Sequence, residues 1–288
     1  MNTRKFLLVV ALLSGVCIQT DAQSLFKKLK QKAAEAFTGN GNPEISTSQK
    51  TGTLGPDADD CVGADNPALK VNTELKREFY TSDVVVEMLN EENKKTISYF
   101  DAEALAMKTI QPGSPDRASY MDSEGFFYGF NKDKGYYEKS GIMNMGAMDM
   151  MGPSIMVTQY KLPTNPFFEK QQYLHDKNVK AFPFLYLEFT FLYKPEDFRG
   201  EGYGEVDYGQ PGYSQFYPTS PGYEGSYVVF DDQHRLIEIN IMVNTEQFKG
   251  TGYIKYAYKP TTVCLPEAKE VKMPFQGLME KAMNPGKN

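Results

Sequence analysis

The sequence predicts a mainly β protein: a curved antiparallel sheet, shaped as a half-barrel, with a few short helices and long loops. Apolar and polar side chains alternate with a period of two from about residue 77 onward, as they do in half-buried strands. The alternating segments are short, and clusters of Asp, Asn, Gly and Ser, which favour turns, separate them. Few segments have helical periodicity. We therefore expect residues 71–288 to form a single β-rich domain.

About eight or nine strands are expected in this domain. In the first half the candidate segments are residues 80–88, 96–100, 105–110, 118–121, 126–130 and 136–139. In the second half the candidate segments are residues 185–193, 226–230, 237–243 and 252–258. Residues 231–234 are expected to form a hairpin turn, and residues 274–283 a short closing helix.

The N-terminus has the pattern of a signal peptide over residues 1–22. Arg4 and Lys5 precede an apolar run of about 11 residues, which is too short to span a bilayer. Ala22 supplies the small residue at a cleavage site. Cys17 raises the alternative of a lipoprotein, but the residue before it is Val16, which is not small, so simple cleavage after Ala22 is favoured.

Export restricts location and partners. We expect the mature chain in the periplasm, associated with the outer membrane or outside the cell, with no transmembrane span. Cleavage changes the formal net charge from −6 to −7. An acidic protein with no basic cluster is a poor nucleic-acid binder.

The mature chain is expected to begin with two segments outside the sheet. Residues 23–38 have the pattern of a basic amphipathic helix, which either lies on a membrane surface or docks loosely on the domain. Residues 39–70 are rich in Gly, Pro, Ser, Thr, Asn and Asp, which predicts a flexible linker.

Cys61 and Cys264 are the only cysteines left after cleavage. In an oxidising compartment they are candidates for a disulfide, with two buried free thiols as the alternative. A bridge closing a loop of this length contributes about 4–5 kcal/mol in the chain-entropy model.

Methionine is concentrated in residues 141–156. Thioether sulfur suits Cu(I), so this segment could bind copper. No histidine lies within it, and methionine also fills irregular gaps and lines adaptable surfaces, so an apolar flap is favoured. The methionines considered as ligand-binding residues are Met143, Met145, Met148 and Met150.

Residues 199–226 combine tyrosine with glycine and proline. The glycines favour a long irregular loop between two strands. Tyrosine provides amphipathic contact surface, so the loop either contacts a carbohydrate or protein partner or is disordered.

Catalytic motifs are missing from the sequence. His175 lies in a charged segment and His234 in an expected turn, so both are interpreted as solvated. No nucleophile elbow, zinc-protease motif or phosphate loop is present. Paired acids such as Asp231 and Asp232 are also attributed to solvation. We therefore expect no enzyme and no cofactor.

Two regions resemble known exported proteins. Residues 231–239 (DDQHRLIEI), 252–256 (GYIKY) and 263–268 (VCLPEA) are similar to the closing hairpin of periplasmic lipoprotein-carrier-like half-barrels. Residues 108–110 (KTI), 126–128 (FFY) and 134–137 (KGYY) look like an uncharacterised family of secreted Bacteroidota envelope proteins, a domain of unknown function. The resemblance covers residues 77–140 and 225–270 and implies a fold, but no catalytic residues.

The leading functional hypothesis is a non-enzymatic envelope protein for binding or assembly, with a lipid-like or protein ligand. The alternatives are a copper-handling protein and a purely structural envelope component. The ligand-binding surface is expected on the apolar face of the 185–193 strand, which contains Leu185, Leu187, Phe189, Phe191 and Tyr193.

Overall fold

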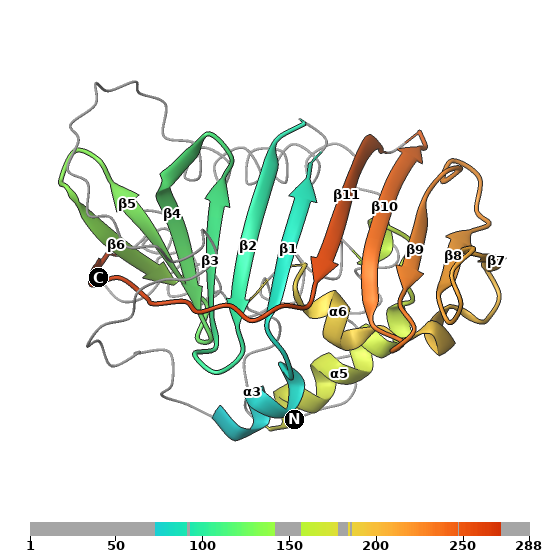
Figure 1. The fold of residues 1–288 in the computed structure, drawn as a ribbon, viewed down its shortest axis with the longest axis horizontal. Coiled ribbons are helices and arrows are strands. Elements are labelled where there is room, and N and C mark those ends of the chain that lie inside the picture. The colour runs from blue at the N-terminus through green and yellow to red at the C-terminus, as the bar shows by residue number, and fades with distance from the viewer. Residues whose placement is uncertain are drawn as a thin grey trace, which may run out of the picture. The chain divides into compact units, whose positions relative to one another are not determined.

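A computed structural model describes residues 73–90, 93–141, 157–177, 184, 186–246 and 248–271, all within the compact unit Thr51–Asn288 (Figure 1). Several predictions lie outside these residues. They are the signal peptide (1–22), the basic helix (23–38), the linker (39–70), the methionine-rich segment beyond residue 141, the closing helix (274–283), Cys61 and Leu185.

The described strands form one open sheet, in the order β12-β6-β5-β4-β3-β2-β1-β11-β10-β9-β8-β7 (Figure 1). Neighbours pair antiparallel except β12 and β6, which are parallel. The prediction of a mainly β, mostly antiparallel fold is confirmed. The strands are β1 (Val84–Leu89), β2 (Lys95–Asp101), β3 (Ala106–Gln111), β4 (Ser114–Asp122), β5 (Phe126–Asn131), β6 (Tyr136–Gly141), β7 (Tyr203–Asp207), β8 (Ser214–Pro218), β9 (Tyr227–Phe230), β10 (Leu236–Asn244), β11 (Lys249–Ala257) and β12 (Ala268–Glu270).

Helices pack on one face of this sheet, called here the inner face. They are α3 (Thr73–Phe79), α5 (Thr164–Asp176), α6 (Glu188–Leu192) and the 3₁₀ helix η1 (Pro195–Phe198). Their apolar side chains join those of the strands in one aromatic-rich cluster. The space in front of this face is therefore filled by a packed core around rings such as Tyr80, Phe100 and Phe184, whose centroids lie 5.1–5.4 Å apart.

The opposite, outer face is partly covered by the chain that follows β11. Val263 and Leu265 pack there in a second apolar cluster with Val85 and Tyr99. Buried Asp101 fixes this strap (residues 259–267), because its Oδ2 accepts a hydrogen bond from Val263 N at 3.0 Å. Beyond the strap, β12 pairs with β6 and protects that edge of the sheet.

Buried aspartates also close the hairpins. Oδ1 of Asp122 accepts hydrogen bonds from the backbone N–H groups of Glu124 and Phe126. Oδ1 of Asp231 accepts from Gln233 and Arg235 in the same way. The attribution of Asp231 to solvation is therefore wrong: this carboxylate is 4% exposed and orders the β9–β10 turn.

The strand predicted over residues 185–193 is wrong, because this segment turns into helix α6. Leu187 N donates to Phe184 O, and Tyr193 N donates to Phe189 O. The alternation of residue types does not reflect a strand here, because Glu188 and Thr190, which lie between the apolar positions, are each only 3% exposed. Glu188 and Thr190 both form hydrogen bonds inside the protein. The segment is therefore buried on all sides and has no exposed polar face, unlike a half-buried strand.

The irregular loop predicted over residues 199–226 is also wrong, since it contains the hairpin of β7 and β8. Most of its glycines have positive φ angles and lie in the turns, for example Gly202 (φ 98°) and Gly212 (φ 83°). Gly204 lies within β7, directly opposite Tyr217 of β8. Most of these glycines therefore form turns next to strands β7 and β8.

The first strand begins later than predicted. Tyr80 and Ser82 precede β1, which starts at Val84, and Tyr80 points into the aromatic core next to α3. Helices α3 and α5 and strand β12 were not predicted. The remaining strand predictions agree with β2–β6 and β9–β11 to within a few residues.

Candidate functional site

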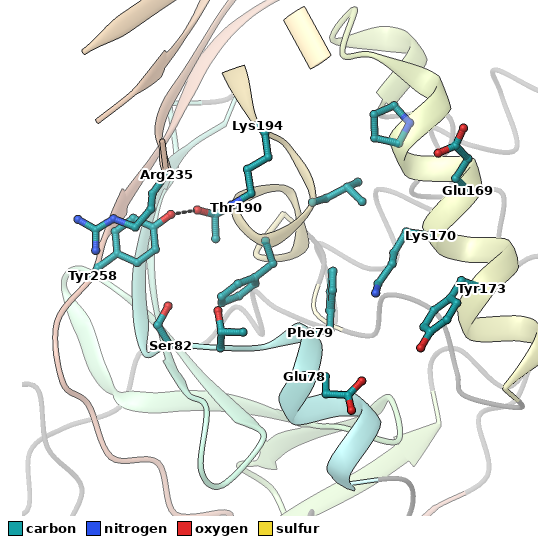
Figure 2. Close-up of a pocket in the computed structure, with 14 residues that line it drawn as sticks. Glu78, Phe79, Ser82, Glu169, Lys170, Tyr173, Thr190, Lys194, Arg235 and Tyr258 are labelled. Atoms are coloured by element: carbon teal, nitrogen blue, oxygen red, sulfur yellow. Dashed lines mark hydrogen bonds between the residues drawn. The ribbon is translucent and has the colours of Figure 1, made fainter. Parts of the chain in front are cut away.

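A pocket of about 550 Å³ opens between α3, α5, α6 and the adjoining ends of β10 and β11 (Figure 2). Its volume is in the range of small-molecule sites. Phe79, Phe191 and Leu192 provide apolar lining, and Thr81, Ser82 and Thr190 contribute hydroxyl groups. The site therefore combines an apolar floor with a polar rim.

Lys170 is the cation most closely associated with this floor. Its Nζ lies 5.0 Å from the ring centroid of Phe79 and 4.6 Å from that of Tyr173. Both distances are in the range of cation–π interactions. Figure 2 shows the ammonium group pointing toward Phe79, in the space between α5 and α3.

The opposite wall is held rigidly by Arg235 and Tyr258. The guanidinium carbon Cζ of Arg235 lies 4.1 Å from the ring centroid of Tyr258. Its Nη2 atom lies 2.6 Å from Oδ2 of buried Asp231. The Tyr258 hydroxyl contacts Thr190 Oγ1 and donates to Leu236 O at 3.0 Å. Burial raises the pKa of Tyr258 to about 12, so the phenol remains a neutral donor.

The rim carries charges of both signs. Lys194 is exposed on the α6 side of the pocket. Glu78 on α3 and Glu169 on α5 are also exposed. Since the positive charge of Arg235 is compensated by Asp231, the pocket has two further cations, Lys170 and Lys194, facing two carboxylates. The rim is close to neutral overall.

A buried acid lies behind the floor. Oε1 of Glu188 accepts hydrogen bonds from Phe184 N at 2.6 Å and from the Tyr80 hydroxyl at 3.0 Å. Burial raises the pKa of Glu188 to about 8, against the opposing effect of these hydrogen bonds. Glu188 does not line the pocket, but its helix carries Thr190, Phe191 and Leu192, which do.

The predicted ligand-binding residues separate into three groups. Leu187, Phe189 and Tyr193 are 0–3% exposed and belong to the packed core, so they face no open surface. Phe191 is half-buried and lines the pocket. Leu185 and the four methionines are outside the described residues, and their role stays a prediction.

Sequence reasoning missed Phe79 and Lys170, together with the helices that carry them. Phe167 and Leu174 are seven residues apart, as on one face of a helix, and Pro166 near its start favours helix initiation. Lys170 and Gln171, which lie on the same face, are polar, so the apolar periodicity that predicts a helix is weak in α5. Nothing in the sequence shows that α3 and α5 meet.

In the described part of the chain, no group of three or more His, Cys, Asp and Glu side chains could hold a metal ion. His234 is 59% exposed, with Nδ1 3.8 Å from Glu196 Oε1. Cys264 is half-buried in the strap, and its predicted bond to Cys61 stays a prediction. No described helix combines the length and apolarity needed to cross a membrane.

No known protein-family model and no curated protein matches the chain. Among solved structures, an uncharacterized conserved protein from Thermus thermophilus is similar over 69% of this chain and 96% of that chain, with 8% sequence identity and a TM-score of 0.32. A likeness this weak carries no argument about function. The resemblance to secreted Bacteroidota proteins therefore stays a prediction.

Proposed function

We propose that this chain is a non-enzymatic binding protein of the bacterial envelope, and that its ligand is a small lipid-like amphiphile held in the pocket between α3, α5 and α6. The observation that carries the proposal is the apolar floor of Phe79, Phe191 and Leu192 beneath a charged rim. Binding of the apolar part of a ligand to such a floor removes apolar surface from water.

The rim suits the polar end of the same ligand. Lys170 and Lys194 can contact an anionic group, while Glu78 and Glu169 accept hydrogen bonds or a cationic group. The packed core replaces the open concave cavity of a carrier. We therefore assign the ligand to the pocket between α3, α5 and α6. With the export that we also propose, binding takes place outside the cytoplasm.

The proposal is tested by native mass spectrometry of the mature protein purified from its host envelope, followed by titration with the apolar dye N-phenyl-1-naphthylamine. We expect a retained lipid-like mass and saturable dye binding. Thr81→Trp places a large ring at the pocket mouth and should weaken dye binding roughly tenfold. Thr219→Trp, at a threonine outside the pocket, is the matched control.

A clean apo mass together with no dye binding would contradict the proposal. So would dye binding that Thr81→Trp and Thr219→Trp leave equally unchanged, because the ligand would then lie elsewhere. The copper alternative depends on methionines outside the described residues and stays a prediction.

A further inference from the structure

The strap contacts the outer face of the sheet at strands other than β8–β11. The apolar contacts of the strap on this face are with strands such as β1 and β2, through Val85 and Tyr99. On β8 and β10, large side chains remain accessible: Tyr217 is 40% exposed and Met242 is 46% exposed. Tyr227, Asn240 and Tyr253 are half-buried, and Val229 of β9 is buried, so the accessible part of this half is limited to the surroundings of Tyr217 and Met242.

Strand register places a row of tyrosines across this half. Asn240 of β10 is paired with Tyr227 on one side and with Tyr253 on the other. Phe216 and Val228 are partners that both point into the inner core. The next residues in the same register, Tyr217 and Tyr227, therefore lie opposite each other on the outer face.

The row runs Tyr217, Tyr227, Asn240, Tyr253 on four consecutive strands. Neighbouring strands are about 4.8 Å apart, so the backbone positions of the row span about 14 Å. The Tyr217 ring leans over Gly204 of β7 and the Tyr253 hydroxyl reaches Glu87 of β1, so the aromatic and amide groups form a strip that crosses the strands.

Each ring in the row is held in place. The Tyr217 ring packs on the backbone of Gly204, where a Cβ atom would collide with it. The Tyr227 hydroxyl donates to Glu238 at 3.1 Å, and the Tyr253 hydroxyl donates to Glu87 at 2.8 Å. Preorganised rings lose little conformational entropy when a ligand binds.

The charges around the row are compensated within the sheet. Lys95 Nζ lies 2.7 Å from Glu87 Oε2, and Lys255 Nζ lies 3.8 Å from Glu238 Oε1. The hydrogen bond from Lys95 is the main reason that the pKa of Glu87 is lowered, which keeps this pair ionised. Lys255 Nζ also lies 5.1 Å from the ring centroid of Tyr253, within cation–π range. The strip therefore offers aromatic rings and hydrogen-bonding groups whose neighbouring charges are paired, which suits an uncharged, polyhydroxylated occupant.

We propose that this row is a binding platform for a neutral glycan chain. The C–H faces of pyranose rings stack on tyrosine, and their hydroxyl groups bond with Asn240 and with the carboxylates that hold the rings. A linear row of rings fits a linear polymer. The platform lies on the face opposite the core that carries α3, α5 and α6, so it does not depend on the proposed ligand of the pocket.

The test is affinity electrophoresis of the full-length mature protein in gels containing laminarin, galactomannan, xylan or dextran, with alginate as a polyanionic comparison. We expect retardation by at least one neutral polysaccharide. The double variant Tyr217→Ala/Tyr253→Ala should raise the apparent dissociation constant roughly tenfold or more. Tyr217→Phe, which keeps the ring, should bind as the wild type does.

Phe130→Ala is the matched control, because Phe130 is 43% exposed on β5, outside the row. Far-ultraviolet circular dichroism checks folding, and Tyr217→Ala alone replaces the double variant if that variant does not fold. Retardation by none of the neutral polysaccharides, retardation by alginate only, or equal retardation of wild type and variant would each overturn the proposal.

Discussion

The Tyr80 hydroxyl donates a hydrogen bond to Oε1 of Glu188 at 3.0 Å, joining residues 108 positions apart. Tyr80 follows α3 and Glu188 begins α6, so the bond ties together two elements that line the pocket. Both side chains are buried. Burial raises the pKa of Glu188 to about 8, so the carboxyl group is mainly protonated at neutral pH.

This acid makes stability depend on pH. The pKa of Glu188 is about 8 in the folded chain, compared with an ordinary value of 4.5, so between these values the folded state binds more protons than the unfolded state. The stabilising contribution is complete below about pH 4.5 and is lost as the pH rises toward 8. We expect the wild type to lose a few kcal/mol more between pH 5 and 9 than Glu188→Gln. Urea unfolding at both pH values measures the difference.

Comparison with the variant removes the contribution of other titrating groups, because these are shared by both proteins. Gln keeps the shape of the side chain and a carbonyl acceptor for Tyr80, but it cannot ionise. Identical pH dependence in the two proteins would show that Glu188 is already ionised in the fold.

Asp101 is predicted to anchor the strap to the β2–β3 turn. Its Oδ1 accepts from Ala104 N at 2.8 Å and its Oδ2 from Val263 N at 3.0 Å. Asp101→Ala leaves two backbone donors without this acceptor, so we expect a loss of about 2–4 kcal/mol in the free energy of unfolding and faster proteolysis within the strap. Asp133→Ala, at an exposed turn position, is the control. Equal stability of the two variants would contradict the anchoring role.

The sheet was predictable because most of its strands obey simple rules. Strands β10 and β11 alternate over much of their length between a buried face and a more exposed face. Aspartates 101, 122 and 231 gave the correct positions of the turns. Their burial was not predictable, because it depends on backbone donors that only the folded hairpin and strap bring close.

The pocket was not predictable for a related reason. Its walls come from α3, α5, α6 and the ends of β10 and β11, and their proximity is a tertiary property. The apolar segment 185–193 fits a strand by alternation, but Glu188 is satisfied in the core by Tyr80, which comes from a distant part of the chain. Local pattern therefore indicated which residues are apolar, but not which of them would line an accessible surface.

Gln171 is a second polar group in the core, and it lacks the partners that Glu188 has. It is 2% exposed on α5, and neither of its amide atoms has a hydrogen-bond partner among the described residues. An unsatisfied buried polar group costs about 1–3 kcal/mol. We expect Gln171→Leu, which is similar in size, to raise the free energy of unfolding by about that amount. Gln172→Leu, at the exposed neighbouring position, should change it little. Destabilisation by Gln171→Leu would show that a buried water or ligand satisfies the amide.

The predicted Cys61–Cys264 disulfide would join the segment before α3 to the strap. Cys264 lies between Val263 and Leu265, whose side chains are buried in the outer cluster, so a bridge there would hold the strap by a covalent bond as well as by Asp101. The chain-entropy model gives about 4–5 kcal/mol for a loop of this length. We expect reductant to lower the melting temperature of the wild type but not of Cys61→Ala/Cys264→Ala. Alkylation of both cysteines in the native, unreduced protein, detected by peptide mass mapping, would show that they are free thiols.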